Sequence, residues 1–125
     1  MPPRQILIID DENDIREVVR LSLQLTENWT VSGANGGAAG TALALTSDLD
    51  AILLDVMMPD MDGPSTLRVL QQNGVTKTIP VIFLTAKVQA ADRQKFMQLG
   101  VRGVISKPFD PLTLGQQIRE MLEWD

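Results

Sequence analysis

Four short stretches of the chain end an apolar run with a polar side chain. Two of these runs end in carboxylates, one in a hydroxyl and one in a lysine: Ile8–Asp11, Ile52–Asp55, Val81–Thr85 and Val104–Pro108. Each run has the length and composition of a buried strand. If the strands form a parallel sheet, the polar ends meet at one edge. Crowded carboxylates need a cation, and a lysine beside them can hold an anion. This pattern is typical of a site for a divalent metal and a phosphoryl group.

The charge balance at this edge favours Mg²⁺. Asp10, Asp11 and Asp55 carry three negative charges against one positive charge on Lys107. Burial of that excess without a cation would be costly, and hard oxygen ligands suit Mg²⁺. With its charge screened, Asp55 could act as a nucleophile that accepts a phosphoryl group. The hydroxyl of Thr85 could donate to a phosphoryl oxygen, and Lys107 could pair with the group.

Each of these residues also has a purely structural interpretation. Asp10 and Asp11 could cap and turn the chain into the first helix, and Asp55 could simply begin a loop. Thr85 could be an ordinary β-branched strand residue, and Lys107 a solvated lysine before a turn. Taken one at a time, several of these structural interpretations are preferable. Because the signals fall at the ends of four separate strands, together they favour a functional site.

Strand and helix patterns alternate along the chain. Apolar runs predict strands over Gln5–Ile9, Trp29–Ala34, Asp50–Asp55, Ile79–Leu84 and Gly103–Ser106. Helical spacing predicts helices over Glu12–Thr26, Ala38–Leu45, Pro64–Gln72, Lys87–Leu99 and Pro111–Trp124, with Asp11, Asn13 and Asp14 available to cap the first. The alternation predicts an α/β fold, with a doubly wound five-stranded parallel sheet and five helices on both faces. Ligands of such sheets bind beyond the carboxyl ends of the strands.

Length and composition restrict the class of protein. The 125 residues fit one domain, residues 1–125, and the net charge of −5 argues against direct nucleic-acid binding. No segment approaches the roughly 18 apolar residues of a membrane span or resembles a signal peptide. The absence of cysteine favours a cytoplasmic location. The absence of histidine means that any phosphohistidine must belong to another molecule.

The polar ends resemble, as a set, those of a known family. Asp10-Asp11, Asp55 within LLDVMMPDMDG, Thr85-Ala86 and Lys107-Pro108-Phe109 look like the receiver domain of two-component response regulators of the chemotaxis-regulator type. The resemblance extends from Ile6 to about Leu122. It implies a flavodoxin-like fold with strand order 2-1-3-4-5. It also implies a signalling switch that catalyses only its own phosphorylation and dephosphorylation, rather than an enzyme.

The resemblance implies a metal site and its ligands. Asp55 would be the phosphoacceptor and a ligand of Mg²⁺. Asp11 would bind the ion directly, and Asp10 largely through water. The backbone carbonyl of Met57 would be a further ligand.

The resemblance also implies how the signal enters and leaves. Thr85 would bind a phosphoryl oxygen and move on activation, while Lys107 would pair with the phosphoryl group. The donor would be a phosphohistidine on a sensor histidine kinase or a histidine phosphotransfer protein. The partner downstream would be a protein, bound at the face of the fourth helix, fifth strand and fifth helix. The chain would be a monomer or a weak dimer.

Two features depart from or refine the family pattern. Val104 stands where many receivers carry a tyrosine or phenylalanine, so an aromatic switch is missing and transmission would rely on backbone shifts. Met57 and Lys87, two residues beyond Asp55 and Thr85, occupy positions that influence loss of the phosphoryl group in similar proteins. A bulky apolar Met57 could shield the phosphorus. We therefore expect self-dephosphorylation to take minutes or longer, and loss within seconds in buffer with Mg²⁺ would contradict this.

Two other functions stay open on the sequence alone. A phosphohydrolase with an aspartate nucleophile after the first strand usually needs a second acid two residues later, but Glu12 stands there and the chain has no room for a substrate-selecting cap. A pseudo-receiver that only mediates protein contacts would not need the full acidic set. The chain ends directly after its last helix, which fits either a stand-alone regulator or a receiver cut from a larger protein. The start at MPPRQ leads us to expect the first.

Overall fold

The computed structural model describes residues 2–86 and 89–125. Within them the chain forms the strands β1 (Gln5–Ile9), β2 (Thr30–Ala34), β3 (Ala51–Asp55), β4 (Val81–Thr85) and β5 (Gly103–Ser106). The helices are α1 (Asn13–Glu27), α2 (Gly37–Leu45), α3 (Gly63–Gln72), α4 (Ala90–Gln98) and α5 (Leu114–Met121). Strands and helices alternate as the sequence predicts.

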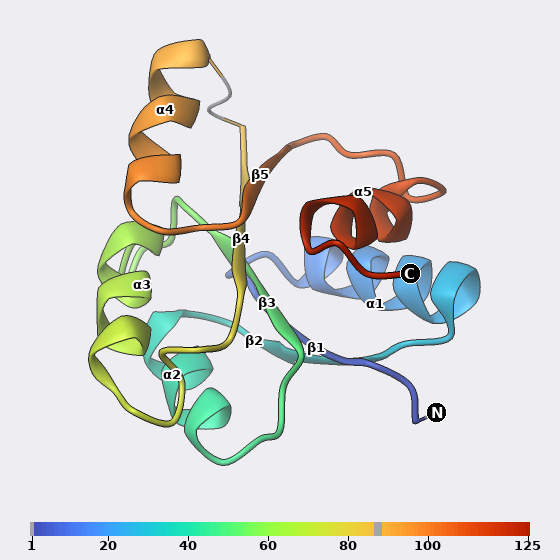
Figure 1. Ribbon diagram of the computed structural model, residues 1–125, viewed down its shortest axis with the longest axis horizontal. Coiled ribbons are helices and arrows are strands. Elements are labelled where there is room, and N and C mark those ends of the chain that lie inside the picture. Colours follow the sequence, from blue (N-terminus) through green and yellow to red (C-terminus); the bar gives the residue numbers. More distant parts are fainter. Residues whose placement is uncertain (1, 87–88) are drawn as a thin grey trace.

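The strands form one parallel sheet in the order β2-β1-β3-β4-β5. Helices α1 and α5 cover one face, and α2, α3 and α4 cover the other (Figure 1). The predicted flavodoxin-like fold with strand order 2-1-3-4-5 is therefore confirmed. Because all strands run in the same direction, the carboxyl ends of β1, β3, β4 and β5 lie at one edge of the sheet.

Two apolar cores, one on each face, hold the sheet between the helices. Successive residues of the central strands alternate between them: Leu7 and Ile9 pack on the α2–α4 side, whereas Ile6 and Ile8 pack on the α1–α5 side. All residues of β3 and β4 are buried. Burial on both faces explains why these strands read as continuous apolar runs rather than alternating ones.

The helix boundaries differ from the prediction at α1. This helix has Glu12 at its N-cap position, which makes no side-chain capping bond, so the predicted capping by a side chain is wrong, whereas Asp14 does place an acidic side chain in the first turn. Instead the backbone N–H of Glu12 donates to Asp10 Oδ1 over 2.8 Å. The turn before the helix is thus built around a carboxylate of the acidic cluster.

The last helix is shorter than predicted. Helix α5 begins at Leu114 rather than Pro111, because the Asp110 side chain accepts a 2.9 Å hydrogen bond from Leu112 N–H and holds a turn there. Phe109, before this turn, packs against the α1–α5 core. The predicted start of the fourth helix, Lys87, lies outside the described residues. In the part of the chain that the structure describes, no helix combines the length and apolar character needed to cross a bilayer.

Candidate metal and phosphoryl site

The strand ends bring the predicted site residues to one edge of the sheet. Asp10 directly follows β1, Asp55 ends β3, Thr85 ends β4 and Lys107 directly follows β5. Carboxylate oxygens of Asp10, Asp11 and Asp55 lie within 4.8 Å of one another. The ammonium Nζ of Lys107 lies 2.8 Å from Asp10 Oδ2 and 3.3 Å from Asp55 Oδ1.

The β4 and β5 ends are joined through the backbone. Thr85 pairs in register with Ser106, and Thr85 is buried. The carbonyl of Thr85 accepts a 2.9 Å hydrogen bond from Lys107 N–H. A displacement of the end of β4 would therefore be transmitted directly to Lys107.

The members of the cluster differ in burial, and burial decides what each one needs. Asp10 and Asp55 are 0% and 3% exposed, whereas Asp11 is exposed. The two buried carboxylates share Lys107 as a cationic partner. Asp55 Oδ1 also accepts a 3.4 Å hydrogen bond from Met57 N–H. The cluster is thus buried on the sheet side and open to solvent beside Asp11.

Burial and like charge alter the protonation of the phosphoacceptor candidate. Burial, and then the neighbouring Asp10 carboxylate, raise the pKa of Asp55 to about 6, although Lys107 and Met57 N–H act in the opposite direction. For Lys107, burial alone would lower the pKa, but the hydrogen bond and charge of Asp10, with those of Asp55, raise it. In the metal-free protein the two carboxylates compete for one ammonium.

This competition predicts a pH-dependent stability in metal-free buffer. A carboxyl whose pKa is about 6 when folded and about 4 when unfolded favours the folded state below pH 4. That contribution is lost as the pH rises through 6. The free energy of unfolding would be measured in urea with a chelator for Asp55→Asn and for the wild type. The difference between the two should grow in favour of the variant by about 2 kcal/mol from pH 4 to pH 8. Parallel pH profiles for the two proteins would contradict the raised pKa.

The donor set fits Mg²⁺. Three carboxylates with oxygen atoms at close range, one of them solvent-exposed, offer the hard ligands that this ion prefers, and open space for the waters it keeps. Met57 stands near the start of the β3–α3 loop and is 62% exposed. Its backbone carbonyl stays a predicted ligand.

The loop after Asp55 is held at several points. Gly63 donates to Val56 O over 2.8 Å, and a Cβ at this position would lie only 2.8 Å from Asp55 O, so the close approach requires glycine. The Asp62 side chain caps α3 through a 2.7 Å bond from Ser65 N–H. An Asp-Gly pair is a typical chain-breaking signal, and here it stands where the loop ends and α3 begins.

Other contacts around the cluster were missed by sequence analysis. The Asp60 carboxylate accepts from the N–H groups of Gly37 and Ala38 at 3.3 and 3.2 Å, so the β3–α3 loop also caps α2. Glu12 Oε1 lies 3.7 Å from Lys107 Nζ, and Arg16 Nη1 donates to Asp10 O over 2.7 Å. No local pattern indicates these contacts, because they depend on how the loops meet in space.

Val104, at which sequence analysis noted a missing aromatic ring, lies in the core. It is 2% exposed and pairs in register with Phe83 of β4. Phe83 in turn packs edge-to-face on Phe96 of α4, with ring centroids 5.1 Å apart. Arg93 of α4 donates to the Val104 carbonyl over 3.3 Å. The contacts between β4, β5 and α4 thus use Phe83 and Arg93 rather than a ring at position 104.

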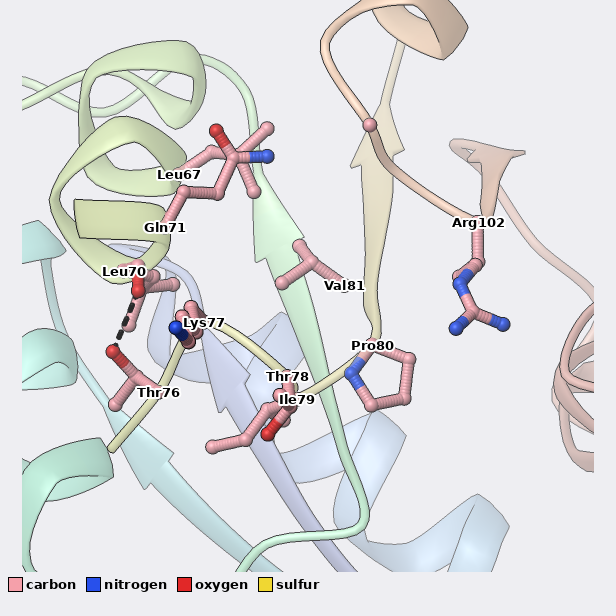
Figure 2. A pocket seen from close by; sticks show the side chains of 11 residues that line it. Leu67, Leu70, Gln71, Thr76, Lys77, Thr78, Ile79, Pro80, Val81 and Arg102 are labelled. Carbon is pink, nitrogen blue, oxygen red and sulfur yellow. Dashed lines mark hydrogen bonds between the residues drawn. The ribbon is translucent and has the colours of Figure 1, made fainter. Parts of the chain in front are cut away.

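A separate cavity of about 280 Å³ lies at the opposite end of the sheet, beside the amino ends of β4 and β5 (Figure 2). It lies between the end of α3, the α3–β4 loop and the segment before β5, where Thr76 Oγ1 donates to Leu70 O. None of the site residues lines it. The cavity therefore takes no part in chemistry at the acidic cluster.

Comparison with known proteins assigns the family. The model of the response regulator receiver domain matches residues 6–119. The chain belongs to the response regulator receiver family. Among curated relatives, this receiver is 36% identical over 118 residues to the transcriptional regulatory protein ResD of Bacillus subtilis, covering 94% of this chain and 48% of that protein. It is also 36% identical to the response regulator ArlR of Staphylococcus saprophyticus, covering 94% of this chain and 52% of that protein.

Solved structures of receivers share the fold over nearly their whole length. The chemotaxis response regulator CheY4 of Vibrio cholerae superposes with a TM-score of 0.89 at 28% identity, covering 96% of this chain and 99% of that one. A putative response regulator from Chloroflexus aurantiacus gives a TM-score of 0.88 at 27% identity, covering 98% and 99%. The receiver spans about half the length of the curated relatives it matches.

Proposed function

We propose that this receiver, as one domain over residues 1–125, takes a phosphoryl group onto Asp55 in a Mg²⁺-dependent reaction. The donor is a phosphohistidine on a sensor histidine kinase or a histidine phosphotransfer protein in the cytoplasm. The observation that supports this most strongly is the cluster of three carboxylates within 4.8 Å, with Lys107 between Asp10 and Asp55. Lys107, the cation that pairs with Asp10 and Asp55, does not balance the charge of all three carboxylates.

We assign the metal ligands to residues at the ends of β1 and β3. Receivers bind Mg²⁺ at an acidic pocket, and the carboxylates of Asp10, Asp11 and Asp55 with the carbonyl of Met57 would hold it here. When bound, the ion would screen the charge of the carboxylates and of the incoming phosphoryl group. The exposed side of the cluster, beside Asp11, is where the ion and the donor would approach.

The transfer makes one bond and breaks one. A carboxylate oxygen of Asp55 attacks phosphorus, and the bond between phosphorus and the donor imidazole nitrogen breaks with its electron pair staying on that nitrogen. With a pKa of about 6, Asp55 is mostly ionised at neutral pH and competent for the attack. Lys107, already 3.3 Å from Asp55 Oδ1, pairs with the new phosphoryl oxygens, and Thr85 donates its hydroxyl to one of them.

Phosphorylation then shifts a population between two states. The phosphoryl group adds negative charge and acceptor oxygens, and it can act only through contacts that differ between the states. Lys107 exchanges part of its contact with Asp10 for the phosphoryl group, and the backbone bond to Thr85 couples this to the end of β4. The Phe83–Phe96 contact and the bond from Arg93 carry the shift to α4 and β5, where a downstream protein binds.

Incubation with acetyl phosphate tests this function against its alternatives. We expect one protein-bound phosphoryl group by intact mass with Mg²⁺ and none with a chelator. Inorganic phosphate should be followed in the same samples. Continuous release of phosphate with no protein-bound group would favour the phosphohydrolase. Neither uptake nor release under any condition would favour a pseudo-receiver.

A further inference from the structure

We propose that Arg16 is a positioning residue for the metal: its guanidinium holds the peptide group between Asp10 and Asp11 and thereby sets the Mg²⁺ affinity. This inference rests on the proposed function of the acidic cluster as a Mg²⁺ site. Arg16 belongs to the first turns of α1, which directly follow the cluster in the chain. It does not belong to the acidic set itself.

The contacts of Arg16 join the helix to this one peptide group. Nη1 donates to Asp10 O over 2.7 Å, and Nη2 donates to Asn13 Oδ1 over 3.0 Å. The Arg16 side chain runs over Gly33 of β2, where a Cβ would lie 3.3 Å from its Cδ. The half-buried guanidinium is therefore held between α1, the edge of β2 and the turn after β1.

The Asp10 carbonyl needs a partner because β1 has ended. The other polar groups of this residue are already bonded: its N–H donates to Ala34 O over 3.1 Å, Oδ1 accepts from Glu12 N–H, and Oδ2 accepts from Lys107. The carbonyl has left the strand ladder, and Arg16 is the group that donates to it. The bond is charge-assisted, so it is among the stronger bonds of the turn.

The orientation of this carbonyl also determines the directions of the Asp10 and Asp11 carboxylates. The Asp10 carbonyl and the Asp11 N–H belong to one rigid peptide plane. A rotation of that plane changes the backbone angles on both sides, and hence the directions of both carboxylates. Asp11 is exposed, so its direction depends mainly on the backbone. Fixing the plane pre-orders the ligand pair before the ion arrives.

Charge and position predict opposite signs for the loss of Arg16. A guanidinium near the site repels Mg²⁺, so on charge alone its removal would tighten binding. If Arg16 positions the ligands, its removal weakens binding, since partners that orient metal ligands typically affect affinity by about 10- to 100-fold. The sign of the change therefore separates the two accounts.

The experiment compares two arginines of the same helix. Mg²⁺ dissociation constants would be measured by calorimetry on the full chain for the wild type, Arg16→Gln, Arg16→Lys and Arg20→Gln. Arg20 is the matched control, because its guanidinium pairs with Glu17 and Gln24 on the helix surface. We expect Arg16→Gln to weaken binding about tenfold and Arg20→Gln to leave it unchanged. Arg16→Lys keeps the charge but loses the planar fork, so it should also weaken binding.

A second readout uses the metal-free protein. Hydrogen exchange at the amide of Glu12, which is bonded to Asp10 Oδ1, should be faster in Arg16→Gln and unchanged in Arg20→Gln.

The positioning role would be overturned, and the proposed function left intact, if Arg16→Gln bound Mg²⁺ as tightly as the wild type or more tightly. An equal loss in Arg20→Gln would overturn it as a general effect of the helix. A wild type that binds no Mg²⁺ would overturn both. If Arg16→Gln fails to fold, Arg16→Lys decides by the same criteria.

Discussion

Asp55→Asn will abolish covalent phosphorylation by acetyl phosphate in the presence of Mg²⁺. The amide lacks the nucleophilic carboxylate, and the neighbouring Asp10 and Asp11 are expected to serve the metal rather than the phosphorus. Intact mass spectrometry should show the added phosphoryl group on the wild type and none on the variant. Uptake that persists in Asp55→Asn would mean that another side chain is the acceptor.

The matched control for this experiment is Asp60→Asn in the same loop. Asp60 caps α2 through its carboxylate oxygens, and an amide oxygen can still accept from those N–H groups. This variant should therefore take up the phosphoryl group as the wild type does. Misfolding is not expected to explain a loss in Asp55→Asn, because removal of the buried charge beside Asp10 relieves repulsion in the metal-free protein.

Lys107→Met will destabilise the metal-free protein at neutral pH by about 3 kcal/mol. The ammonium is the shared partner of Asp10 and Asp55, whose side chains are 0% and 4% exposed, and methionine leaves both charges buried without it. The loss should shrink below pH 6, because Asp55 then takes up a proton. Urea unfolding in chelator at pH 5 and pH 8 measures both values.

The exposed lysine of α4 provides the control, since Lys95→Met should change the free energy of unfolding by less than about 0.5 kcal/mol.

Mg²⁺ should stabilise Lys107→Met at least as strongly as the wild type, because the metal replaces the missing positive charge. The same variant should lose more of the phosphorylation-dependent response than of its metal binding. Equal stability of Lys107→Met and the wild type in chelator would show that the ammonium does not balance the two carboxylates.

The architecture could be predicted from the sequence because its main signals are local. The β3 and β4 runs are buried on both faces, so they are apolar throughout, and the helices between the strands have their own spacing. Parallel strands then place Asp10, Asp55, Thr85 and Lys107 at one edge without further information. The same residues carried the resemblance to the receiver family, which implied the strand order, and both the family and the order are confirmed.

The supporting contacts could not be predicted, because each depends on how separate loops meet. Asp60 reaches the N-terminus of α2 across 23 residues of sequence, and nothing in the MMPDMDG segment distinguishes it from a plain turn residue. Arg16 has the spacing of an ordinary exposed helix residue, yet its side chain turns back to the Asp10 carbonyl. The predicted capping of α1 was wrong for a related reason: the Asp10 carboxylate, which the resemblance assigned to the metal, also accepts from Glu12 N–H through Oδ1.

The contacts around position 104 could only partly be predicted from the sequence. The absence of an aromatic residue at position 104 was evident, but the alternative contacts were not. The edge-to-face packing of Phe83 on Phe96 and the bond from Arg93 to Val104 O require the position of α4 over β4 and β5. Through these contacts β4 and β5 are connected to α4 without an aromatic ring at position 104.

The most direct test is to locate the phosphoryl group on the chain. The wild type would be treated with acetyl phosphate, with and without Mg²⁺, and then with borohydride, which reduces an aspartyl phosphate to homoserine and frees phosphate. Peptide mapping should find homoserine at position 55 alone, and only in the sample with Mg²⁺. Homoserine at any other aspartate, or at position 55 without a divalent cation, would contradict a carboxylate and metal site built from the four strand ends.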